Sequence, residues 1–251
     1  MELLIANGGR FEINHLLFAD NTALVADSEE KLCRLVSEFG RVCERRKLRV
    51  NVGKSKVKRC SRYCNGDRMH VILKCEPLEE VDCFKYLGSQ VAADGGCERD
   101  VVHRMNSGYR ACWAVLKSVM SNRGLGISAK KCLYEEVIVP TALYGAEAWG
   151  MRSVERRKVN VREMKCLRSL VGVSRMDRVR NEELRRRAGI ERELASRADQ
   201  RVLRWFGHVE RMDEYRMARK VLMAEVSGGR VRERPRLGWM DGVQVAKAIE
   251  E

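Results

Sequence analysis

The residues of this sequence best suited to metal chemistry lie near its start, at positions 18–21 (Phe-Ala-Asp-Asn). Asp20 and Asn21 both tolerate turn geometry, and the residues on either side alternate between apolar and polar, which predicts two strands joined by this turn. A carboxylate held rigidly in such a turn can bind Mg²⁺ through a hard oxygen ligand. Phosphoryl transfer by two metal ions needs several such ligands. An Asp-Asn pair between strands is most often only a turn, so this chemistry needs support from the rest of the chain.

The elements around this turn predict a mixed segment followed by a helical one. Asp27 is a candidate N-cap for a helix whose apolar stripe begins at Leu32. Further strands are predicted at residues 49–58, 69–74 and 83–87. Beyond residue 96, apolar residues recur every three or four positions, in a stripe that includes Met105 and Tyr109, and they indicate amphipathic helices, one of them ended or kinked by Pro140. The predicted fold class is α+β.

The composition of the chain limits the classes of protein to which it could belong. Of 251 residues 45% are hydrophobic, enough for the cores of one or two domains. Residues 1–100 carry 17 basic and 16 acidic groups, whereas residues 101–251 carry 32 basic and 19 acidic groups. Positive charge concentrated in this way favours a polyanionic partner, most often nucleic acid, and a solvated Arg-rich surface is the alternative. No apolar stretch is long enough to predict a membrane span. The ten scattered cysteines are typical of a reducing intracellular compartment, cytoplasmic or nuclear.

Further motifs follow the Asp-Asn turn in a defined order. They are Leu-Arg-Val-Asn-Val-Gly-Lys at 48–54, Phe-Lys-Tyr-Leu-Gly-Ser at 84–89, Ile-Val-Pro-Thr-Ala-Leu-Tyr-Gly-Ala-Glu-Ala-Trp at 138–149, Arg-Trp-Phe-Gly-His-Val-Glu-Arg-Met at 204–212 and Arg-Pro-Arg-Leu-Gly-Trp at 234–239. In type and order these segments resemble the palm and post-palm blocks of non-LTR retrotransposon (LINE-type) reverse transcriptases. The resemblance covers residues 13–243.

The resemblance implies an architecture of three parts. Residues 1–95 are expected to be the C-terminal part of a palm, with antiparallel β-hairpins and one packed helix. Residues 96–175 are expected to form a thumb-like helical region, and residues 176–251 a basic helical C-terminal region.

The resemblance also implies roles for individual residues. Asp20, Asn21 and Lys54 correspond to the catalytic site, where Asp20 is the Mg²⁺ ligand and Lys54 lies near the incoming phosphates. Tyr86, Leu87 and Gly88 correspond to the primer grip, the turn that positions the end of the growing strand. Primer–template is expected along these residues and along the helix at 102–120.

Two departures from the family shape the functional prediction. The family's other metal-binding aspartate belongs to an upstream strand, and Asn21 stands where the family has a second Asp. We therefore expect a fragment of an RNA-directed DNA polymerase that is inactive alone and retains largely nonspecific binding to RNA or DNA. The alternative is a basic helical nucleic-acid-binding or scaffold protein without a polymerase role. The oligomeric state is not indicated.

Two basic segments are candidate nucleic-acid contacts. Residues 41–62 contain ten basic residues and one acid, and residues 230–236 alternate arginine with other residues around Pro235. Such runs are often only solvated, but several phosphate contacts would make binding fall steeply with salt. The residues selected are Arg45, Arg46, Lys47, Lys56, Lys58, Arg230, Arg232, Arg234 and Arg236.

Cys60, Cys64, His70 and Cys75 come close to the spacing of a zinc knuckle. Two of the three gaps are one residue too long, and His70 and Cys75 fall on a predicted strand whose side chains alternate between faces. We therefore expect these four residues to have no role in metal binding, in preference to forming a zinc site.

Overall fold

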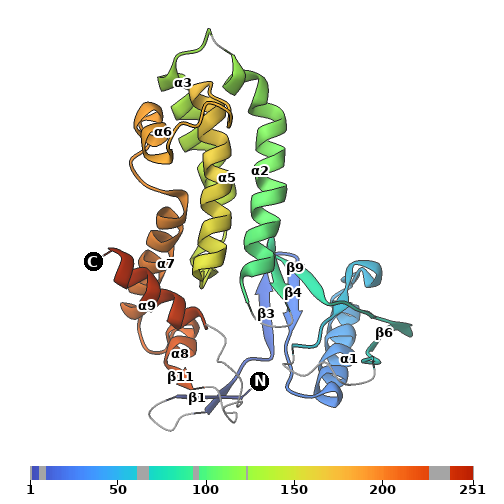
Figure 1. Cartoon of the computed structure of the whole chain (residues 1–251). Coiled ribbons are helices and arrows are strands. Elements are labelled where there is room, and N and C mark those ends of the chain that lie inside the picture. The colour runs from blue at the N-terminus through green and yellow to red at the C-terminus, as the bar shows by residue number, and fades with distance from the viewer. Residues whose placement is uncertain are drawn as a thin grey trace. The chain divides into compact units, whose positions relative to one another are not determined.

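The computed structural model describes residues 2–5, 10–60, 68–92, 96–122, 124–225 and 238–250 (Figure 1). Short strands and one long helix come first, and a series of helices follows. The α+β class predicted from the sequence is confirmed. The chain divides into two compact units. The mixed unit comprises Met1–Leu87, Val91–Gly95 and His208–Pro235, and the helical unit comprises Gly88–Gln90, Gly96–Gly207 and Arg236–Glu251.

The strands of the mixed unit are short and pair in small sheets. In the largest described sheet, β1 (Glu2–Ile5) lies between β2 (Arg10–Glu12) and β11 (Ala224–Glu225). The other described pairs are β3 (His15–Phe18) with β4 (Asn21–Leu24), β5 (Lys56–Val57) with β8 (Glu79–Glu80), β6 (Ile72–Leu73) with β7 (Glu76–Pro77), and β9 (Cys83–Tyr86) with β10 (Ser89–Ala92). The helices of this unit are α1 (Glu29–Arg45) and α8 (Met217–Met223).

The N-cap of helix α1 lies one residue later than predicted. The backbone N–H of Lys31 donates to Ser28 Oγ at 3.2 Å, so Ser28 is the N-cap and the prediction of Asp27 was wrong. Asp27 instead accepts from the Lys31 ammonium at 2.9 Å. One face of α1 packs its buried Val36 into a small core with Val57, Val71, Leu73 and Leu78.

The segment 49–58, predicted to be a strand, is one only at Lys56–Val57. Residues Val52–Lys54 form a 3-10 turn (η1). The Asn51 side chain accepts from the backbone N–H of Lys54 at 3.1 Å, and this local bond competes with strand pairing.

Helices of different lengths make up most of the helical unit. They are α2 (Glu98–Ser121), α3 (Ile127–Leu133), the π-helical η2 (Tyr134–Ile138), α4 (Val139–Ala142), the 3-10 turn η3 (Ala146–Ala148), α5 (Ser153–Val171), α6 (Asn181–Ala188), α7 (Leu194–Glu210) and α9 (Trp239–Glu250). Pro140 has no N–H to donate, and the turn immediately before α4 widens to π-helical geometry.

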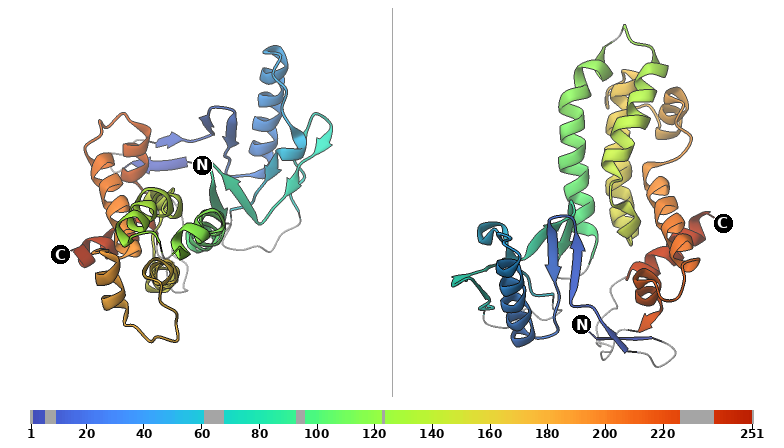
Figure 2. Two further views of the ribbon diagram at one scale, coloured as in Figure 1. Left: turned by 90° about the horizontal axis from the view of Figure 1, so that it is seen from above. Right: turned by 180° about the vertical axis from the view of Figure 1, so that it is seen from behind.

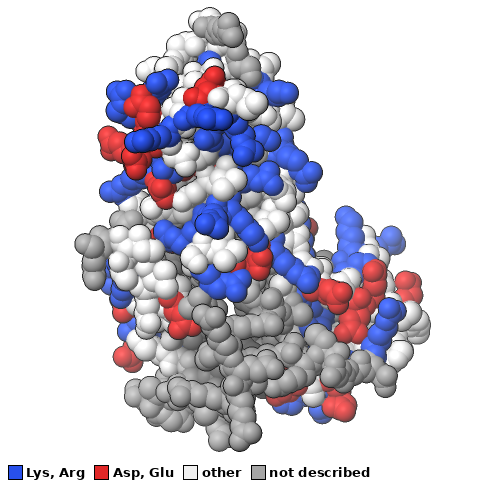
Figure 3. Space-filling view, viewed as in Figure 1, with Lys and Arg blue, Asp and Glu red and all other residues white. Residues whose placement is uncertain are grey.

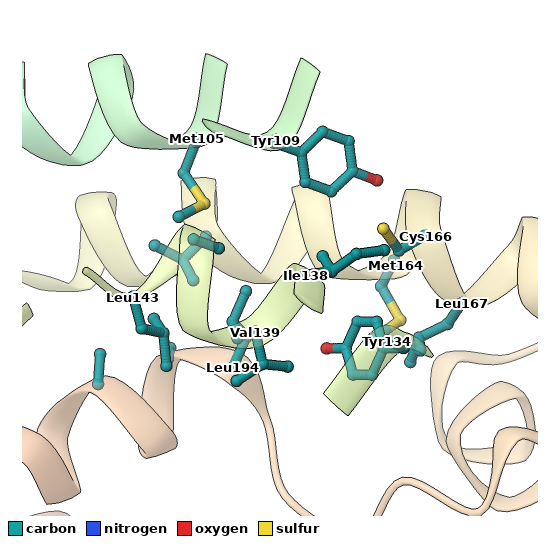
Figure 4. Close-up of a cluster of buried hydrophobic side chains, with 14 of the residues drawn as sticks. Met105, Tyr109, Tyr134, Ile138, Val139, Leu143, Met164, Cys166, Leu167 and Leu194 are labelled. Carbon is teal, nitrogen blue, oxygen red and sulfur yellow. The ribbon is translucent and has the colours of Figure 1, made fainter. Parts of the chain in front are cut away.

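Helices α2 and α5 and the rod formed by α3, η2 and α4 stand side by side (Figures 1 and 2). Their shared core includes Met105 and Tyr109 from α2, Tyr134 and Ile138 from η2, and Leu167 from α5 (Figure 4). Met105 and Tyr109 belong to the apolar stripe predicted from the sequence, and both are buried.

Candidate nucleic-acid interface

The motif at residues 18–21 forms the tip of the β3–β4 hairpin. Phe18 pairs with Asn21, so the two turn residues are Ala19 and Asp20, one position before the predicted Asp-Asn turn. Ala19 has φ of 50°, in the left-handed region typical of two-residue hairpin turns. The Asn21 side-chain amide donates to Asp20 Oδ1 at 3.3 Å, and both side chains are exposed. The strands therefore present one carboxylate and its neighbouring amide to solvent.

This tip offers one carboxylate and one amide oxygen as ligands for Mg²⁺. Within the described ranges, no cluster of three or more His, Cys, Asp or Glu side chains could hold a metal ion. Mg²⁺ usually takes one or two carboxylates together with substrate phosphates and water. Asp20 supplies one carboxylate, and Asn21 offers an amide oxygen without negative charge.

Lys54, assigned to the same site by resemblance, lies at the end of η1 in the mixed unit with its side chain exposed. In the described part of the chain, no hydrogen bond or ion pair joins Lys54 to Asp20 or Asn21. The three residues therefore share a unit of the fold, but no direct contact assembles them.

The basic run after α1 separates into exposed and engaged side chains. Arg45, Arg46 and Lys47 are exposed where the helix ends. The Lys56 ammonium pairs with Glu79 at 2.5 Å. The Lys58 ammonium donates to the backbone oxygens of Asp82 and Val91, at 3.0 and 2.5 Å. Lys56 and Lys58 thus contact neighbouring segments of this unit. Of the five basic residues selected from this run, Arg45, Arg46 and Lys47 are therefore the more accessible cations. The four candidate arginines at 230–236 lie outside the described residues.

The turn that corresponds to the primer grip joins β9 to β10. Leu87 and Gly88 both have positive φ, 47° and 87°, as a two-residue hairpin turn requires. Tyr86 is the last residue of β9. The guanidinium of Arg104 donates through Nη2 to the carbonyl oxygen of Gly88 at 2.6 Å. A Cβ at residue 88 would lie 2.7 Å from the same nitrogen and would displace the guanidinium, and the positive φ favours glycine.

Cations of α5 contact polar side chains of α2. Arg162 Nη2 donates to Asn106 Oδ1 at 2.7 Å, and the Lys158 ammonium pairs with Glu98 at 2.6 Å. The order of these contacts shows that the two helices run in the same direction. Arg110 and Lys117 of α2 and Lys165 of α5 are exposed. We call the set of Asn106, Arg110, Lys117, Lys158, Arg162 and Lys165 the α2–α5 seam.

Lys and Arg side chains spread over the helical unit in Figure 3. Nucleic acid was predicted to lie along the helix at 102–120, but the individual residues of the α2–α5 seam were not identified from the sequence. The seven-residue spacing of Arg110 and Lys117, which puts them on one helix face, was the available signal. The contribution of α5 could not be read from spacing because it depends on helix packing.

Many arginines of the C-terminal stretch are engaged in ion pairs. Arg185 pairs with the fully buried Glu163 and with Glu193, at 2.7 and 2.8 Å. Arg186 and Arg187 both pair with Glu183, and these hydrogen bonds lower the pKa of that carboxyl to about 2. Further exposed cations lie in the loop before α6, at Arg175, Arg178 and Arg180.

The zinc-knuckle spacing has no metal site to match it among the described residues. Cys60, His70 and Cys75 are exposed, and the backbone N–H of His70 donates to Glu29 Oε1 at 2.8 Å. Cys64 lies outside the described residues.

Comparisons with known proteins point to mobile genetic elements. Over 213 residues the chain is 27% identical to an uncharacterized transposon-derived protein from Caenorhabditis elegans, and this match covers 81% of the chain and 74% of that relative. No protein-family model and no solved structure matches the chain. Of the helices in the described ranges, none combines the length and apolar character needed to cross a bilayer. The similarity indicates a transposon-related origin.

Proposed function

We propose that this chain is a C-terminal part of a non-LTR retrotransposon reverse transcriptase that holds primer–template nucleic acid and does not polymerise alone. The order of the motifs and the similarity to a transposon-derived protein support the origin. The α2–α5 seam is the observation that carries the binding proposal. Nucleic acid of either type, recognised largely without sequence preference, is the proposed partner in the cell.

The seam fits a phosphate backbone in spacing and charge. Arg110 and Lys117 are separated by about 10 Å along α2, because a helix rises about 1.5 Å per residue. Phosphates of one strand follow one another at about 3.4 Å along a duplex axis, so the two cations span about three nucleotides. Lys165 adds a further exposed ammonium from the neighbouring helix. Contacts of this kind hold the backbone and carry little sequence information.

The absence of polymerisation follows from the hairpin tip. Asp20 is the ligand that this chain would contribute to Mg²⁺, and the ion would supply the charge that stabilises phosphoryl transfer. One carboxylate beside the neutral Asn21 is too few for the two-metal reaction. Lys54 would neutralise phosphate charge only when a complete site brings the nucleotide near it.

Binding is tested with a fluorescently labelled primer–template and two triple variants of equal charge change. One variant is Arg110→Glu, Lys117→Glu and Lys165→Glu, and the other is Arg175→Glu, Arg178→Glu and Arg180→Glu. We expect the first to weaken binding and to reduce the slope of log K against log salt by about 3, since each phosphate contact contributes about 0.9. A larger loss in the second variant would favour the alternative, a basic helical protein that binds nucleic acid through the arginines before α6. The absence of binding by the unsubstituted chain would contradict the proposal.

Catalysis is tested by primer extension with Mg²⁺ and with Mn²⁺. We expect no extension by the chain alone. Template-dependent synthesis that disappears in the Asp20→Ala variant would overturn this part of the proposal.

A further inference from the structure

Tyr144 is an aromatic residue that projects from a rigid turn. It lies between α4 and η3, and it is 53% exposed. The residue before it, Leu143, is fully buried, and its carbonyl oxygen accepts a hydrogen bond from Arg201 Nη1 at 2.8 Å. The residue after it, Gly145, has φ of 76°, and a Cβ there would lie 2.8 Å from Ser89 Oγ. The backbone on both sides of the ring is therefore fixed.

Arg104 holds the ring from the side of α2. Its Cζ lies 4.4 Å from the centroid of the Tyr144 ring, a cation–π contact. The same guanidinium donates to the carbonyl oxygen of Gly88 at 2.6 Å. One side chain thus ties the exposed ring to Gly88 of the hairpin turn.

The ring also lies directly beside Gly88. A Cβ at residue 88 would be 3.3 Å from Tyr144 Cε1, so the ring edge packs against the turn. An exposed ring that is oriented in advance loses little conformational entropy when a flat ligand stacks on it. Bases stack on such rings irrespective of their identity, because every base has a π face. The positive charge of Arg104 beside the ring favours a ligand that also carries phosphate.

We propose that Tyr144 is a nucleic-acid contact that stacks on a base or sugar of the strand lying beside Gly88, and that Arg104 is the residue that positions it. This inference rests on the proposed function, because it assigns a specific contact to the nucleic acid that the chain is proposed to hold. It differs from the α2–α5 seam in chemistry, since stacking depends on a ring and the seam depends on charge.

The experiment compares Tyr144→Leu, Tyr144→Ser and Tyr144→Phe in the full chain. The probe is a primer–template whose primer ends in 2-aminopurine, and affinity is followed by anisotropy in a second labelled copy. We expect the Leu and Ser variants to bind about 5- to 150-fold more weakly, the range for loss of one stacked base. The Phe variant should bind as the unsubstituted chain does. The dependence of affinity on salt should stay unchanged in all three, because no charge is removed.

Two further variants test whether the effect depends on the position of the Tyr144 ring and on its contact with Arg104. Tyr215, which is 72% exposed in the mixed unit, is a control, and Tyr215→Ser should leave binding unchanged. Arg104→Lys keeps the charge but removes the planar group that stacks, so it should reduce the quenching of 2-aminopurine.

Failure of this inference can be distinguished from failure of the proposed function. Tyr144→Leu retains apolar bulk, so weak binding by Leu together with full binding by Phe assigns the effect to the ring and not to loss of folding. Full binding by Tyr144→Leu overturns this inference and leaves the proposed function standing. If the unsubstituted chain binds no primer–template, both fail.

Discussion

The indole Nε1 of Trp149 donates a hydrogen bond to Oδ2 of Asp100 at 2.8 Å, and both residues are buried. The other oxygen of the carboxylate accepts from the backbone N–H of Gln90 at 2.6 Å. One buried side chain of α2 therefore fixes the segment after α4 and a residue of β10. The two contacts of Asp100 hold Gln90, two residues after Gly88, against the core of the helical unit.

We predict that Asp100→Ala destabilises the chain strongly, because the buried indole N–H of Trp149 and the half-buried backbone N–H of Gln90 lose this acceptor. Each unsatisfied group costs about 1–3 kcal/mol, so a loss of at least about 2 kcal/mol is expected in urea unfolding. Trp149→Phe removes one of the donors, and the double variant should therefore lose less than the two single losses combined. Strictly additive losses would show that the bond does not couple the two residues.

The second prediction concerns the buried carboxylate of Glu163. It accepts from the Tyr134 hydroxyl at 3.1 Å and from the backbone N–H of Leu194 at 3.0 Å, and it pairs with Arg185. Glu163→Gln leaves Arg185 with only its half-exposed partner Glu193, and removal of one member of a buried pair costs about 3 kcal/mol or more. Thermal unfolding measures the loss.

A matched control for Glu163 is Glu183→Gln, which breaks exposed pairs with Arg186 and Arg187. Solvent screens such pairs, so we expect no measurable change in stability. Equal effects of the two substitutions would contradict the importance assigned to burial.

The third prediction is a pH dependence at the start of α5. Burial raises the pKa of the Glu155 carboxyl, but hydrogen bonds from the Arg152 side chain and from backbone N–H groups outweigh it, so the net pKa is below its ordinary value of 4.5. A lowered pKa means that the ionised group stabilises the fold above pH 4.5, and that this contribution is lost as the pH falls through the folded-state pKa.

Glu155→Gln cannot ionise, so it isolates this contribution. We expect the difference in unfolding free energy between the unsubstituted chain and this variant to stay constant between pH 7 and pH 5 and to shrink below about pH 4.5. A difference that is independent of pH down to 3 would refute the assignment.

The fourth prediction concerns the reactivity of Cys97. Burial, followed by the negative charge of Glu155, raises the pKa of its thiol to about 11. The thiolate is the reactive form, so Cys97 should be alkylated by iodoacetamide at pH 9 far more slowly than the exposed Cys132. Mass-spectrometric peptide mapping over a time course measures both rates. Comparable rates would mean that the Cys97 thiol is accessible and ionised.

Periodicity predicted the main elements because helices and hairpins are encoded by neighbouring residues. The stripe with Met105 and Tyr109 is the buried face of α2, and the Asp-Asn motif lies at the tip of a hairpin. Two of the errors were displacements by one residue. Ser28 rather than Asp27 caps α1, and the turn falls at Ala19 and Asp20, because either neighbour could satisfy the same backbone geometry.

Some of the candidate functional residues were identified from sequence motifs, and others only from the structure. Sequence order alone pointed to Asp20, Lys54 and the turn at Gly88, since these lie in short motifs. No motif marked Tyr144 as a partner of Arg104, which is 40 residues away in the chain.

The sequence by itself determined the helical and strand periodicities, the excess of positive charge after residue 100 and the order of the motifs, because each is a property of local composition. Only the tertiary structure decided which cations are consumed by ion pairs, as Arg185 is by Glu163, and which remain exposed, as Arg110 and Lys117 do. The physical reason is that contacts such as the ion pair between α5 and α6, or the guanidinium of Arg104 over the Tyr144 ring, form only when packing brings distant residues within a few ångströms.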